Sequence, residues 1–338
     1  MVRSVFYALG LCFLAGILVG CAGKGGSQSL PDWVVLPPDD TAEAIYGVGE
    51  GRSLREARDD ALADIAGKLE TRVSADVEME TVLANGEERS RTRNRIRTTT
   101  EALRLTEFRT HKSAESATGL FVLVSIDRAS LISSMEAELA TLDSEITGRL
   151  SDSEGDSVKR MFRLTMSLPL IHQGISKAML LQSLAQTPAR YQARLSEYQS
   201  LLNERESLQQ SVRIGVRWDN NTAGVGEAVL ESLLRHGVHS EPANTGEHYD
   251  GFIEIASQRV DSEIFNEFHV QLNANADLLG ADGAIVSSAR CQAAASSLAS
   301  YEAATVSVNR VIARQVREQG VWRALNMQAV PKGPADRR

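Results

Sequence analysis

The chain has 338 residues, of which 36 are Lys or Arg and 44 are Asp or Glu, giving a net charge of −8. This acidic balance disfavours a nucleic-acid partner, because phosphate backbones attract surfaces that are rich in basic residues. The length allows two domains of ordinary size, and a hydrophobic content of 43% is that of a folded protein.

The first twenty residues have the pattern of a bacterial signal peptide. Arg3 supplies a basic start, and residues 5–19 form an apolar run that is shorter than the ~20 apolar residues of a membrane-spanning helix. The run ends in Leu-Val-Gly-Cys at residues 18–21, which resembles the lipobox of bacterial lipoproteins. That resemblance implies cleavage before Cys21 and acylation of this cysteine. An ordinary secretory signal with an incidental cysteine is the alternative.

Lipidation of Cys21 predicts a lasting membrane anchor, because each buried CH₂ of an acyl chain contributes ~0.8 kcal/mol. In the lipoproteins that this segment resembles, an aspartate after the cysteine favours retention in the inner membrane, so Ala22 favours the outer membrane. Residues 21–30 are rich in glycine and predict a flexible, lipidated tether. Cys291 is then the only other cysteine of the mature chain, so we expect no internal disulfide.

Residues 31–128 are predicted to form a first α+β domain. A strand is expected at 44–48, followed by a helix whose start carries the capping-box pair Ser53 and Glu56. The apolar residues of this helix recur at helical spacing and predict one buried stripe. They are Leu54, Ala57, Ala61, Ile65 and Leu69.

Three glycines, Gly47, Gly49 and Gly51, lie between this strand and this helix, where a phosphate-binding loop is one interpretation. The dinucleotide-binding pattern also requires a glycine at the position of Arg52. Close packing of the strand against a neighbouring backbone is therefore the favoured interpretation.

An antiparallel hairpin is predicted around Asn85-Gly86, because this dipeptide readily adopts the positive φ angles of a two-residue turn. In that register three acidic residues oppose three arginines, and the other face is apolar. The pairs are Glu80 with Arg91, Glu78 with Arg93 and Asp76 with Arg95, and the apolar residues are Val73, Ala75, Val77 and Met79. Further strands are expected at 102–108 and 120–126.

Alternating arginines of this hairpin point to one side of a strand. They are Arg89, Arg91, Arg93, Arg95 and Arg97. One interpretation is a docking face for anionic groups such as lipid phosphates or glycan carboxylates. The favoured interpretation is a surface whose middle is neutralised by the three acidic partners, which leaves Arg89 and Arg97 without an acidic partner in this register.

Residues 129–211 are predicted to be helical, with an interruption at Pro169 and a restart at Thr187-Pro188. A helical hairpin that joins two α+β domains is the favoured arrangement. A coiled-coil stalk for oligomerisation is the alternative, although the apolar heptads are not sustained.

Residues 212–326 are predicted to form a second α+β domain. It begins with a strand at 212–218 and a helix at 222–236, and it ends with a helix at 298–325. Residues 327–338 are expected to be a disordered tail.

A second hairpin is predicted around Asp282-Gly283. This turn places Ala274 opposite Cys291 on an apolar face and Asn275 opposite Arg290 on a polar face. Cys291 is therefore expected to pack as a small hydrophobe in the core, with a reactive thiol as the alternative.

Histidines and acidic residues after the helix at 222–236 form the one candidate metal cluster of the sequence. They are His236, His239, Glu241, His248 and Asp250. Gly237 is expected to end the helix there, so scattered loop histidines are the favoured interpretation. No nucleophile elbow, phosphate-binding loop, zinc-protease helix or carboxylate pair of known spacing is evident, so we expect no catalytic residue, metal or cofactor.

Four features of the first domain together resemble the LPP-twenty family of twenty-kilodalton outer-membrane lipoproteins. They are Pro31-Asp32-Trp33 after the tether, the strand segment 46–49, the helix residues Ala57, Ala61 and Ala66, and the closing strand 121–127. The resemblance covers about residues 31–130 and implies a non-enzymatic envelope lipoprotein with a dodecin-like α+β fold. Relatives in this family include proteins of flagellar outer-membrane rings and surface antigens. The helical region and the second domain set this chain apart from the short members.

The sequence therefore predicts an α+β protein, with two α+β domains joined by a helical hairpin after a lipoprotein signal peptide. The leading hypothesis is a non-enzymatic outer-membrane lipoprotein whose periplasmic domains are a structural or assembly component of an envelope machine. Its expected partners are the outer membrane, through Cys21, and envelope proteins, with self-association left open. The alternative is a module that binds cell-wall glycan or anionic lipid through the arginines 89–97. An enzyme of an unrecognised type is the third hypothesis.

Overall fold

The computed structural model describes residues 30–80, 108–116, 119–153, 155–185, 189–324 and 328–329. These residues form two compact units, one of residues 30–68 and 108–130, and the other of residues 69–80 and those from Leu131 onward. Both units combine helices with a sheet, so the predicted α+β class is confirmed. The predicted signal peptide and most of the predicted tether lie outside the described residues.

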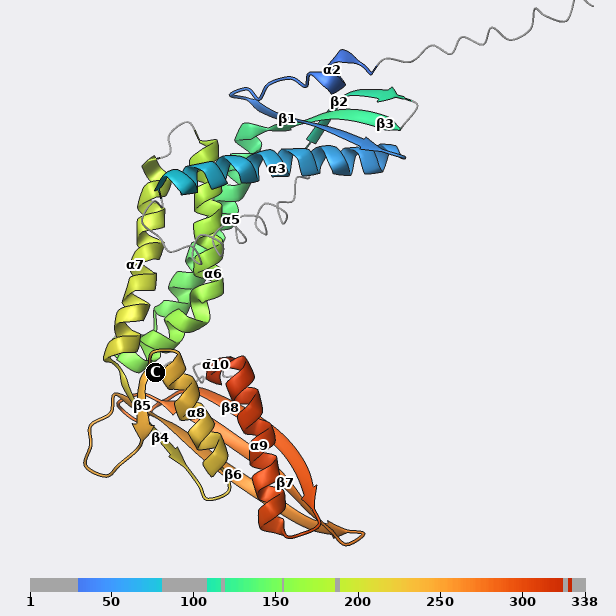
Figure 1. The fold of residues 1–338 in the computed structure, drawn as a ribbon. Helices are drawn as coiled ribbons and strands as arrows, with labels where there is room; N and C mark the ends of the chain where they lie inside the picture. Colours follow the sequence, from blue (N-terminus) through green and yellow to red (C-terminus); the bar gives the residue numbers. More distant parts are fainter. Residues whose placement is uncertain are drawn as a thin grey trace, which may run out of the picture. The chain divides into compact units, whose positions relative to one another are not determined.

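The first unit is a three-stranded antiparallel sheet with a helix packed on it (Figure 1). Its elements are α2 Asp32–Val35, β1 Ala44–Gly51, the part of α3 Leu54–Glu80 up to residue 68, β2 Phe108–Glu115 and β3 Leu120–Asp127. The strand order is β1-β3-β2, so β3 is central. Residues 121–126 of β3 are all buried, as their continuous and mainly apolar sequence predicts for a central strand.

The α3 helix approaches β1 so closely that only glycine fits at alternating positions of the strand. A Cβ at Gly47 would lie 2.2 Å from the carbonyl oxygen of Ala61, and one at Gly49 would lie 2.1 Å from the Ala61 nitrogen. A Cβ at Gly51 would lie 2.4 Å from the nitrogen of Ala57. The packing interpretation of these glycines is therefore confirmed.

The start of α3 carries the predicted capping pair in a shifted form. The Ser53 hydroxyl accepts a hydrogen bond from the Glu56 amide at 3.2 Å. The Glu56 carboxylate reaches back to the amide of Arg52 at 2.8 Å, one residue before the expected one. Two backbone donors at the helix start are thus satisfied by this pair.

In the described part of the chain, the outer edge of β1 is closed by side chains of α3 and not by another strand. Three hydrogen bonds do this, and each joins an α3 side chain to a backbone group of the strand. They are Asp64 with the Val48 amide (3.2 Å), Asp60 with the Glu50 amide (2.9 Å) and Lys68 with the Tyr46 carbonyl (2.9 Å). The four-residue repeat of a helix face and the two-residue repeat of a strand edge coincide here. An edge that would otherwise be open to pairing with another chain is satisfied within the unit.

The α3 helix continues to Glu80, so the strand predicted at residues 73–80 is wrong. The four-residue spacing of the buried Ala61 and Ile65 continues through Val73 and Val77, and this helical repeat overrides the alternation that the same residues show. The predicted pairs between the acidic residues 76, 78 and 80 and the arginines 91, 93 and 95 fail, because those acidic residues lie in a helix.

Other predictions for the first domain meet the limits of the described residues. The Asn85-Gly86 turn and residues 102–107 lie outside them, and β2 begins at Phe108, the last residue of the strand expected at 102–108. The strand expected at 120–126 is confirmed as β3.

The described part of residues 128–211 forms three long helices, α5 Arg128–Leu150, α6 Ser157–Leu184 and α7 Ala189–Ser211. The predicted interruption at Pro169 is wrong, because Pro169 lies inside α6. The break comes earlier, where Asp156 caps α6 by accepting a hydrogen bond from the Lys159 amide at 2.9 Å. The favoured helical hairpin is therefore replaced by a group of three helices.

The C-terminal sheet has the strand order β5-β4-β6-β7-β8-β9, and α8 and α9 cover one of its faces (Figure 1). β4 pairs in parallel with β5 and β6, and the other neighbours are antiparallel. The elements are β4 Arg213–Trp218, α8 Ala223–Arg235, β5 His239–Pro242, β6 Gly251–Ile264, β7 Glu267–Leu279, β8 Ile285–Ser297, α9 Tyr301–Gln319, α10 Val321–Ala324 and β9 Gln328–Ala329.

Two details at the C-terminal end differ from the sequence predictions. The helix expected at 298–325 is divided into α9 and α10 at Gly320, whose φ of +81° does not fit a continuous helix. Residues 328–329 lie in the stretch expected to be a disordered tail, and they pair with Ser287 and Ser288 of β8.

The core between the C-terminal sheet and its helices also contains the start of α6. Val158, Met161 and Phe162 are buried within it, and the Phe162 ring meets the Trp322 ring edge-on with centroids 5.6 Å apart. α6 and the C-terminal sheet therefore share one hydrophobic core.

β7 and β8 pair in the predicted register, with Ala274 opposite Cys291 and Asn275 opposite Arg290. The loop between β7 and β8 is longer than the two residues expected. The register shifts by one residue between Leu278 and Leu279, so the predicted pairs further along the strands are unchanged. Cys291 is partly buried and packs against the core, and this burial raises the pKa of its thiol. The expected role of Cys291 as a small core hydrophobe is confirmed.

β6 and β7 form a longer hairpin that sequence analysis did not predict. It is paired throughout, from Phe252 opposite Leu279 to Ile264 opposite Glu267. Its loop is Phe265-Asn266, with φ angles of +51° and +62°. These positive values are those of a two-residue turn that Asn-Gly normally occupies.

Candidate functional site

The site residues predicted from the sequence are not among the described ones. Cys21 and the arginines 89, 91, 93, 95 and 97 all lie outside the described segments, so lipidation and the arginine face stay predictions. Among the described residues, the second unit holds the pockets considered below, together with the region of the predicted histidine cluster.

The histidine cluster is not assembled into a site. His236 stands at the C-terminal end of α8, where its Nδ1 lies 2.6 Å from the Ser232 carbonyl oxygen. Gly237, with a φ of +76°, ends the helix as predicted. Within the described segments, no group of three or more His, Cys, Asp or Glu residues is placed to hold a metal ion.

The acidic members of that cluster bind Arg213 at the start of β4. The Glu241 carboxylate lies 2.5 Å from the Arg213 guanidinium, and the Asp250 carboxylate accepts a hydrogen bond from the Arg213 amide at 2.8 Å. Glu247 lies 3.8 Å from the same guanidinium and accepts a hydrogen bond from Tyr249 at 2.8 Å. These contacts lower the pKa of Glu247, with the Tyr249 hydrogen bond as the main cause. The group is an ion-pair network at the sheet edge.

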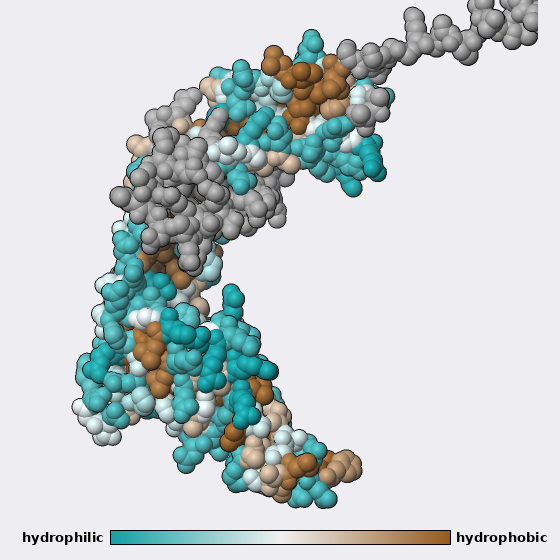
Figure 2. Space-filling model, in the orientation of Figure 1, coloured by the Kyte–Doolittle hydropathy of each residue, from teal (hydrophilic) through white to brown (hydrophobic). Residues whose placement is uncertain are grey.

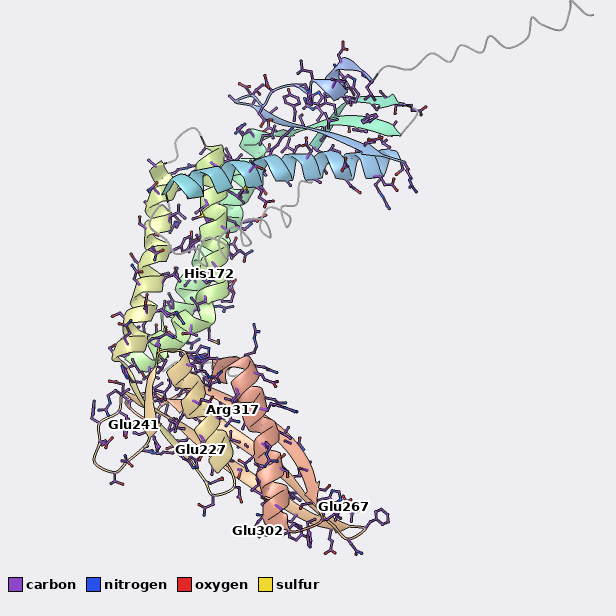
Figure 3. All side chains as sticks on the ribbon, in the orientation of Figure 1. His172, Glu227, Glu241, Glu267, Glu302 and Arg317 are labelled. Atoms are coloured by element: carbon purple, nitrogen blue, oxygen red, sulfur yellow. The ribbon has the colours of Figure 1, made fainter. Side chains whose placement is uncertain are left out.

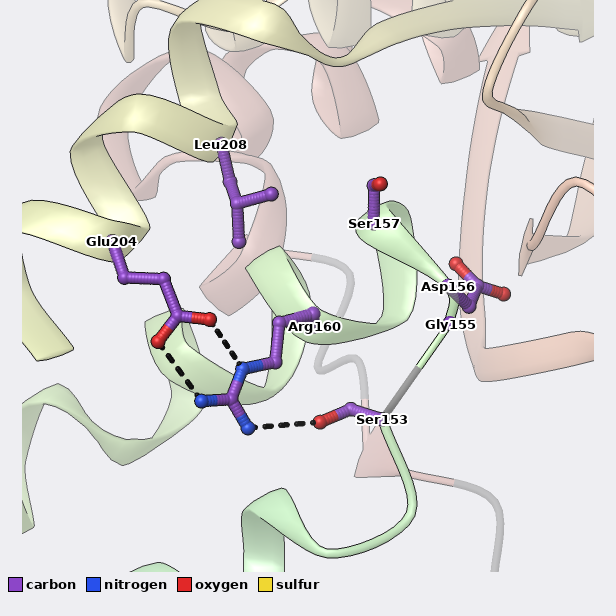
Figure 4. Close-up of a pocket in the computed structure, with 7 residues that line it drawn as sticks. All are labelled: Ser153, Gly155, Asp156, Ser157, Arg160, Glu204 and Leu208. Atoms are coloured by element: carbon purple, nitrogen blue, oxygen red, sulfur yellow. Dashed lines mark hydrogen bonds and ion pairs between the residues drawn. The ribbon is translucent and has the colours of Figure 1, made fainter.

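An open pocket of about 440 Å³ lies beside the turn between α5 and α6 (Figure 4). Its central group is Arg160, which donates from Nε and Nη2 to the two carboxylate oxygens of Glu204 on α7, at 2.7 and 2.9 Å. Nη1 of Arg160 lies 3.4 Å from the Ser153 hydroxyl and 3.4 Å from the Leu150 carbonyl oxygen. This bidentate pair fixes α6 to α7.

Asp156 is the other carboxylate of this pocket, and it is also engaged in the fold. It caps α6, and a Cβ at Gly280 would lie 2.1 Å from its Oδ2, so the carboxylate abuts the loop between β7 and β8. Arg160 and Glu204 thus bind each other, and Asp156 binds the backbone of its own helix, so the three charged groups of the pocket serve contacts within the fold.

A second pocket of about 340 Å³ lies between α8 and α9. Figure 3 shows Glu227 on α8 and Arg317 on α9. The Arg317 guanidinium donates to Glu231 at 2.8 Å and holds the pKa of that carboxyl below its usual value. Asn309, almost fully buried, donates its amide to the Asn221 carbonyl at 2.5 Å and so ties α9 to the turn before α8. This pocket has a small, largely apolar lining without a nucleophile and base in contact.

Sequence reasoning missed both pockets. Arg160 and Glu204 stand 44 residues apart, and neither lies in a motif of recognisable spacing. Such a pair depends on how α6 and α7 pack, so no local signal in the sequence announces it.

A family of known proteins matches the first part of the chain. Residues 31–127 match the model of the LPP20 lipoprotein family. The resemblance predicted from the sequence for about residues 31–130 is thereby confirmed. No curated protein sequence matches the chain. None of the helices in the described segments combines the length and the hydropathy of a membrane-spanning segment.

The solved structures that are similar to the chain include the following two. The crystal structure of the secreted protein HP1454 from Helicobacter pylori is 12% identical, with a TM-score of 0.45, and the match covers 82% of this chain and 98% of that one. A minor lipoprotein from Acinetobacter baumannii is 12% identical, with a TM-score of 0.28, and the match covers 36% of this chain and 96% of that one. Similarities this low carry no functional argument.

Proposed function

We propose that this chain is a non-enzymatic lipoprotein of the bacterial outer membrane, anchored through lipidated Cys21. Its folded units act on the periplasmic side as a structural or assembly component of an envelope machine. The observation that carries the proposal is the match of residues 31–127 to the LPP20 lipoprotein family, which begins ten residues after the lipobox cysteine.

The chemistry of the two described pockets supports a binding or scaffold role over catalysis. Arg160 is held by Glu204, and Arg317 is held by Glu231, so each of these cations is used to join two helices. Catalysis needs a nucleophile or general base aimed at a substrate, and the arginines Arg160 and Arg317 of these pockets are each paired with a carboxylate of a neighbouring helix.

Membrane anchoring is tested by cell fractionation of the full chain. Cys21→Ser should move the protein from the membrane fraction to the soluble periplasmic fraction, and Ala22→Asp should move it towards the inner membrane. Cys291→Ser is the matched control and should leave the protein in the outer membrane. Membrane association that survives Cys21→Ser would contradict the anchor.

The scaffold role is tested by chemical cross-linking in intact cells, followed by mass spectrometry of the purified adducts. The proposal expects adducts of defined mass with envelope proteins, at a stoichiometry near that of the chain. Recovery of the chain without any envelope protein, together with turnover of a substrate by the purified protein, would contradict it.

The alternative is a module that binds cell-wall glycan or anionic lipid through the arginines 89–97. One observation favours it: residues 76, 78 and 80 lie in α3, so the strand pairing that was expected to neutralise the arginines does not hold. Arg89→Glu combined with Arg97→Glu should then abolish sedimentation with purified cell wall or with phosphatidylglycerol vesicles. Arg314→Glu, on the exposed side of α9, is the control. Unchanged sedimentation of the double variant would contradict this alternative.

A further inference from the structure

The β6–β7 hairpin ends in a group of exposed apolar side chains. Phe265 is 97% exposed and Ile264 is 47% exposed at the turn. Leu298, 78% exposed, directly follows Ser297, which pairs with Phe268 at the same end of the sheet. We call Ile264, Phe265 and Leu298 the tip patch. Figure 2 shows brown and tan atoms at this end of the domain.

The backbone at Phe265 makes this exposure unusual. Its φ of +51° lies in the left-handed region, which favours glycine and asparagine and which a bulky side chain disfavours. Water also disfavours a fully exposed phenyl ring. Phenylalanine is thus unfavourable here both for its backbone conformation and for its exposure to water. Because strained residues concentrate at functional positions, we infer that Phe265 serves a function other than folding.

The tip patch is carried on a rigid support. β6 and β7 stay paired up to Ile264 opposite Glu267. Phe268 packs edge-on against Tyr301 at the start of α9, with ring centroids 4.9 Å apart. A side chain presented on such a support loses little conformational freedom on binding, which favours affinity.

Carboxylates outnumber cations near the tip patch, where His269 Nε2 lies 3.7 Å from a Glu267 carboxylate oxygen and Arg259 is paired with Asp261. Glu263 and Glu267 flank the turn, and Figure 3 shows Glu267 and Glu302 at this end of the domain. Glu302 belongs to the first turn of α9, where hydrogen bonds from its own amide and from Ser300 lower its pKa and keep it ionised. An acidic surround is repelled by anionic lipid headgroups and is complementary to Lys and Arg on a protein.

We propose that the tip patch is a docking element that inserts Phe265 into an apolar pocket with a basic rim on an envelope protein. An exposed aromatic ring with a polar surround has the composition of a binding hot spot. The inference rests on the proposed scaffold function and names the part of the chain that makes the contact.

The first test places a photocrosslinker on the hairpin in living cells. Phe265 is replaced by benzoylphenylalanine in the full-length lipoprotein, and Leu36, an exposed residue of the first unit, is replaced in a control strain. The expected result is a protein adduct of one defined mass from position 265 and not from position 36. The linked peptide of the partner should carry apolar residues beside Lys or Arg, and adding Glu267→Lys should weaken the adduct. Adducts only with lipid, only with a second copy, or with nothing would overturn the proposal.

The second test measures affinity for the captured protein after purification, with the Cys21→Ser form of the chain. Phe265→Asn should weaken binding by ten-fold or more, while Leu234→Asn, at an exposed apolar position on α8, should change it by less than two-fold. Asparagine suits a positive φ, so loss of folding does not explain a weaker complex. Equal affinity for wild type and Phe265→Asn would overturn the proposal. Binding to phosphatidylcholine or phosphatidylglycerol vesicles that Phe265→Asn abolishes would overturn it in favour of a membrane contact.

The experiments distinguish failure of the docking proposal from failure of the scaffold function. If Cys21→Ser releases the protein and cross-linking captures an envelope partner, but Phe265→Asn binds that partner normally, the docking element is wrong and the scaffold function stands. If the Cys21→Ser protein stays on membranes and no envelope partner is captured, the scaffold function itself is wrong.

Discussion

The hydroxyl of Tyr198 on α7 donates a hydrogen bond of 2.5 Å to the carboxylate of Asp143 on α5. Seven residues earlier on each helix, the Tyr191 hydroxyl donates to the carboxylate of Glu136. Because seven residues are close to two helical turns, α5 and α7 repeat one tyrosine to carboxylate contact along their facing sides. Gly174 of α6 makes room for the Tyr198 ring, since a Cβ at Gly174 would lie 2.5 Å from Tyr198 Cζ. The three helices are thus held by specific polar contacts as well as by apolar packing.

Removing the Tyr198 hydroxyl should destabilise the second unit. Tyr198→Phe leaves the Asp143 carboxylate, 19% exposed, with Arg194 at 3.2 Å as its remaining ionic partner. We expect a loss of about 1.5–3 kcal/mol in the free energy of unfolding, as for hydrogen bonds to charged groups. Urea unfolding followed by circular dichroism measures it. Tyr191→Phe is the control and should cost less, because Glu136 is 35% exposed and keeps Arg190. A larger loss at Tyr191 would contradict this ranking.

Tyr198 should also make stability depend on alkaline pH. Burial, and next the Asp143 carboxylate, raise the pKa of Tyr198 above its usual value of about 10. An unfolded tyrosine ionises above about pH 10 while the folded one keeps its proton, so the contribution is present below pH 10 and is lost as pH rises further. The unfolding free energy should therefore fall more steeply as pH rises above about 10 in the wild type than in Tyr198→Phe. Equal slopes would show that Tyr198 does not carry the effect.

Gly49→Ala should disrupt the first unit. The new Cβ would lie 2.1 Å from the nitrogen of Ala61, and backbone cannot move aside as a flexible side chain would. We expect a destabilisation of about 3 kcal/mol, at the upper end of overpacking effects. Gly67→Ala on α3, the helix that faces Gly49, is the control, because its Cβ would meet nothing within 4 Å. This control should stabilise α3 by about 0.5–1 kcal/mol. The measurement is thermal unfolding of the two variants in the Cys21→Ser chain. A similar Tm for both would contradict the inference that α3 approaches β1 too closely for a Cβ at residue 49.

Phe265→Asn should stabilise the isolated chain. Asparagine tolerates the φ of +51° better than phenylalanine, and the gain should be about 1 kcal/mol. Differential scanning calorimetry of the Cys21→Ser chain measures the shift in Tm. A lower Tm would mean that the phenyl ring contributes to folding, which its exposure argues against.

Arg160 and Glu204 should be energetically coupled. A double-mutant cycle with Arg160→Met and Glu204→Gln should give a coupling of about 1 kcal/mol, since the pair is bidentate but partly exposed. The coupling should shrink in high salt, because ions screen the exposed part of the interaction. If the two single substitutions change the free energy of unfolding additively, the pair has no role in joining α6 to α7.

Local patterns predicted the parts of the fold that depend on neighbours in sequence. The β7–β8 register followed from the Asp282-Gly283 turn and from strict alternation, because a slip of one residue would turn Ala274 to the opposite face. The glycines facing Ala57 and Ala61 followed in the same way, since small residues on both elements permit a close approach.

Long-range packing decided the rest. Residues 73–79 satisfy both a two-residue and a four-residue repeat, and only continuation of α3 selects the helix. The Phe265-Asn266 turn lacks the glycine that marks such turns, so a pattern search passes over it. A proline usually marks a helix end in sequence, because it has no amide for the helical hydrogen bond. In α6 the helix continues past Pro169, since residues before and after it are buried and hold the helix in place.

The shared core of α6 and the C-terminal sheet limits how this chain can be divided. A fragment starting after Ser211 would lack Val158, Met161 and Phe162, leaving an empty apolar space under the sheet and an unpaired ring at Trp322. The smallest fragment of this end that folds alone should therefore begin before Asp156. We expect the helices and the sheet to unfold in one cooperative transition. A mechanical force on the helices would then be transmitted to the strands of the β6–β7 hairpin.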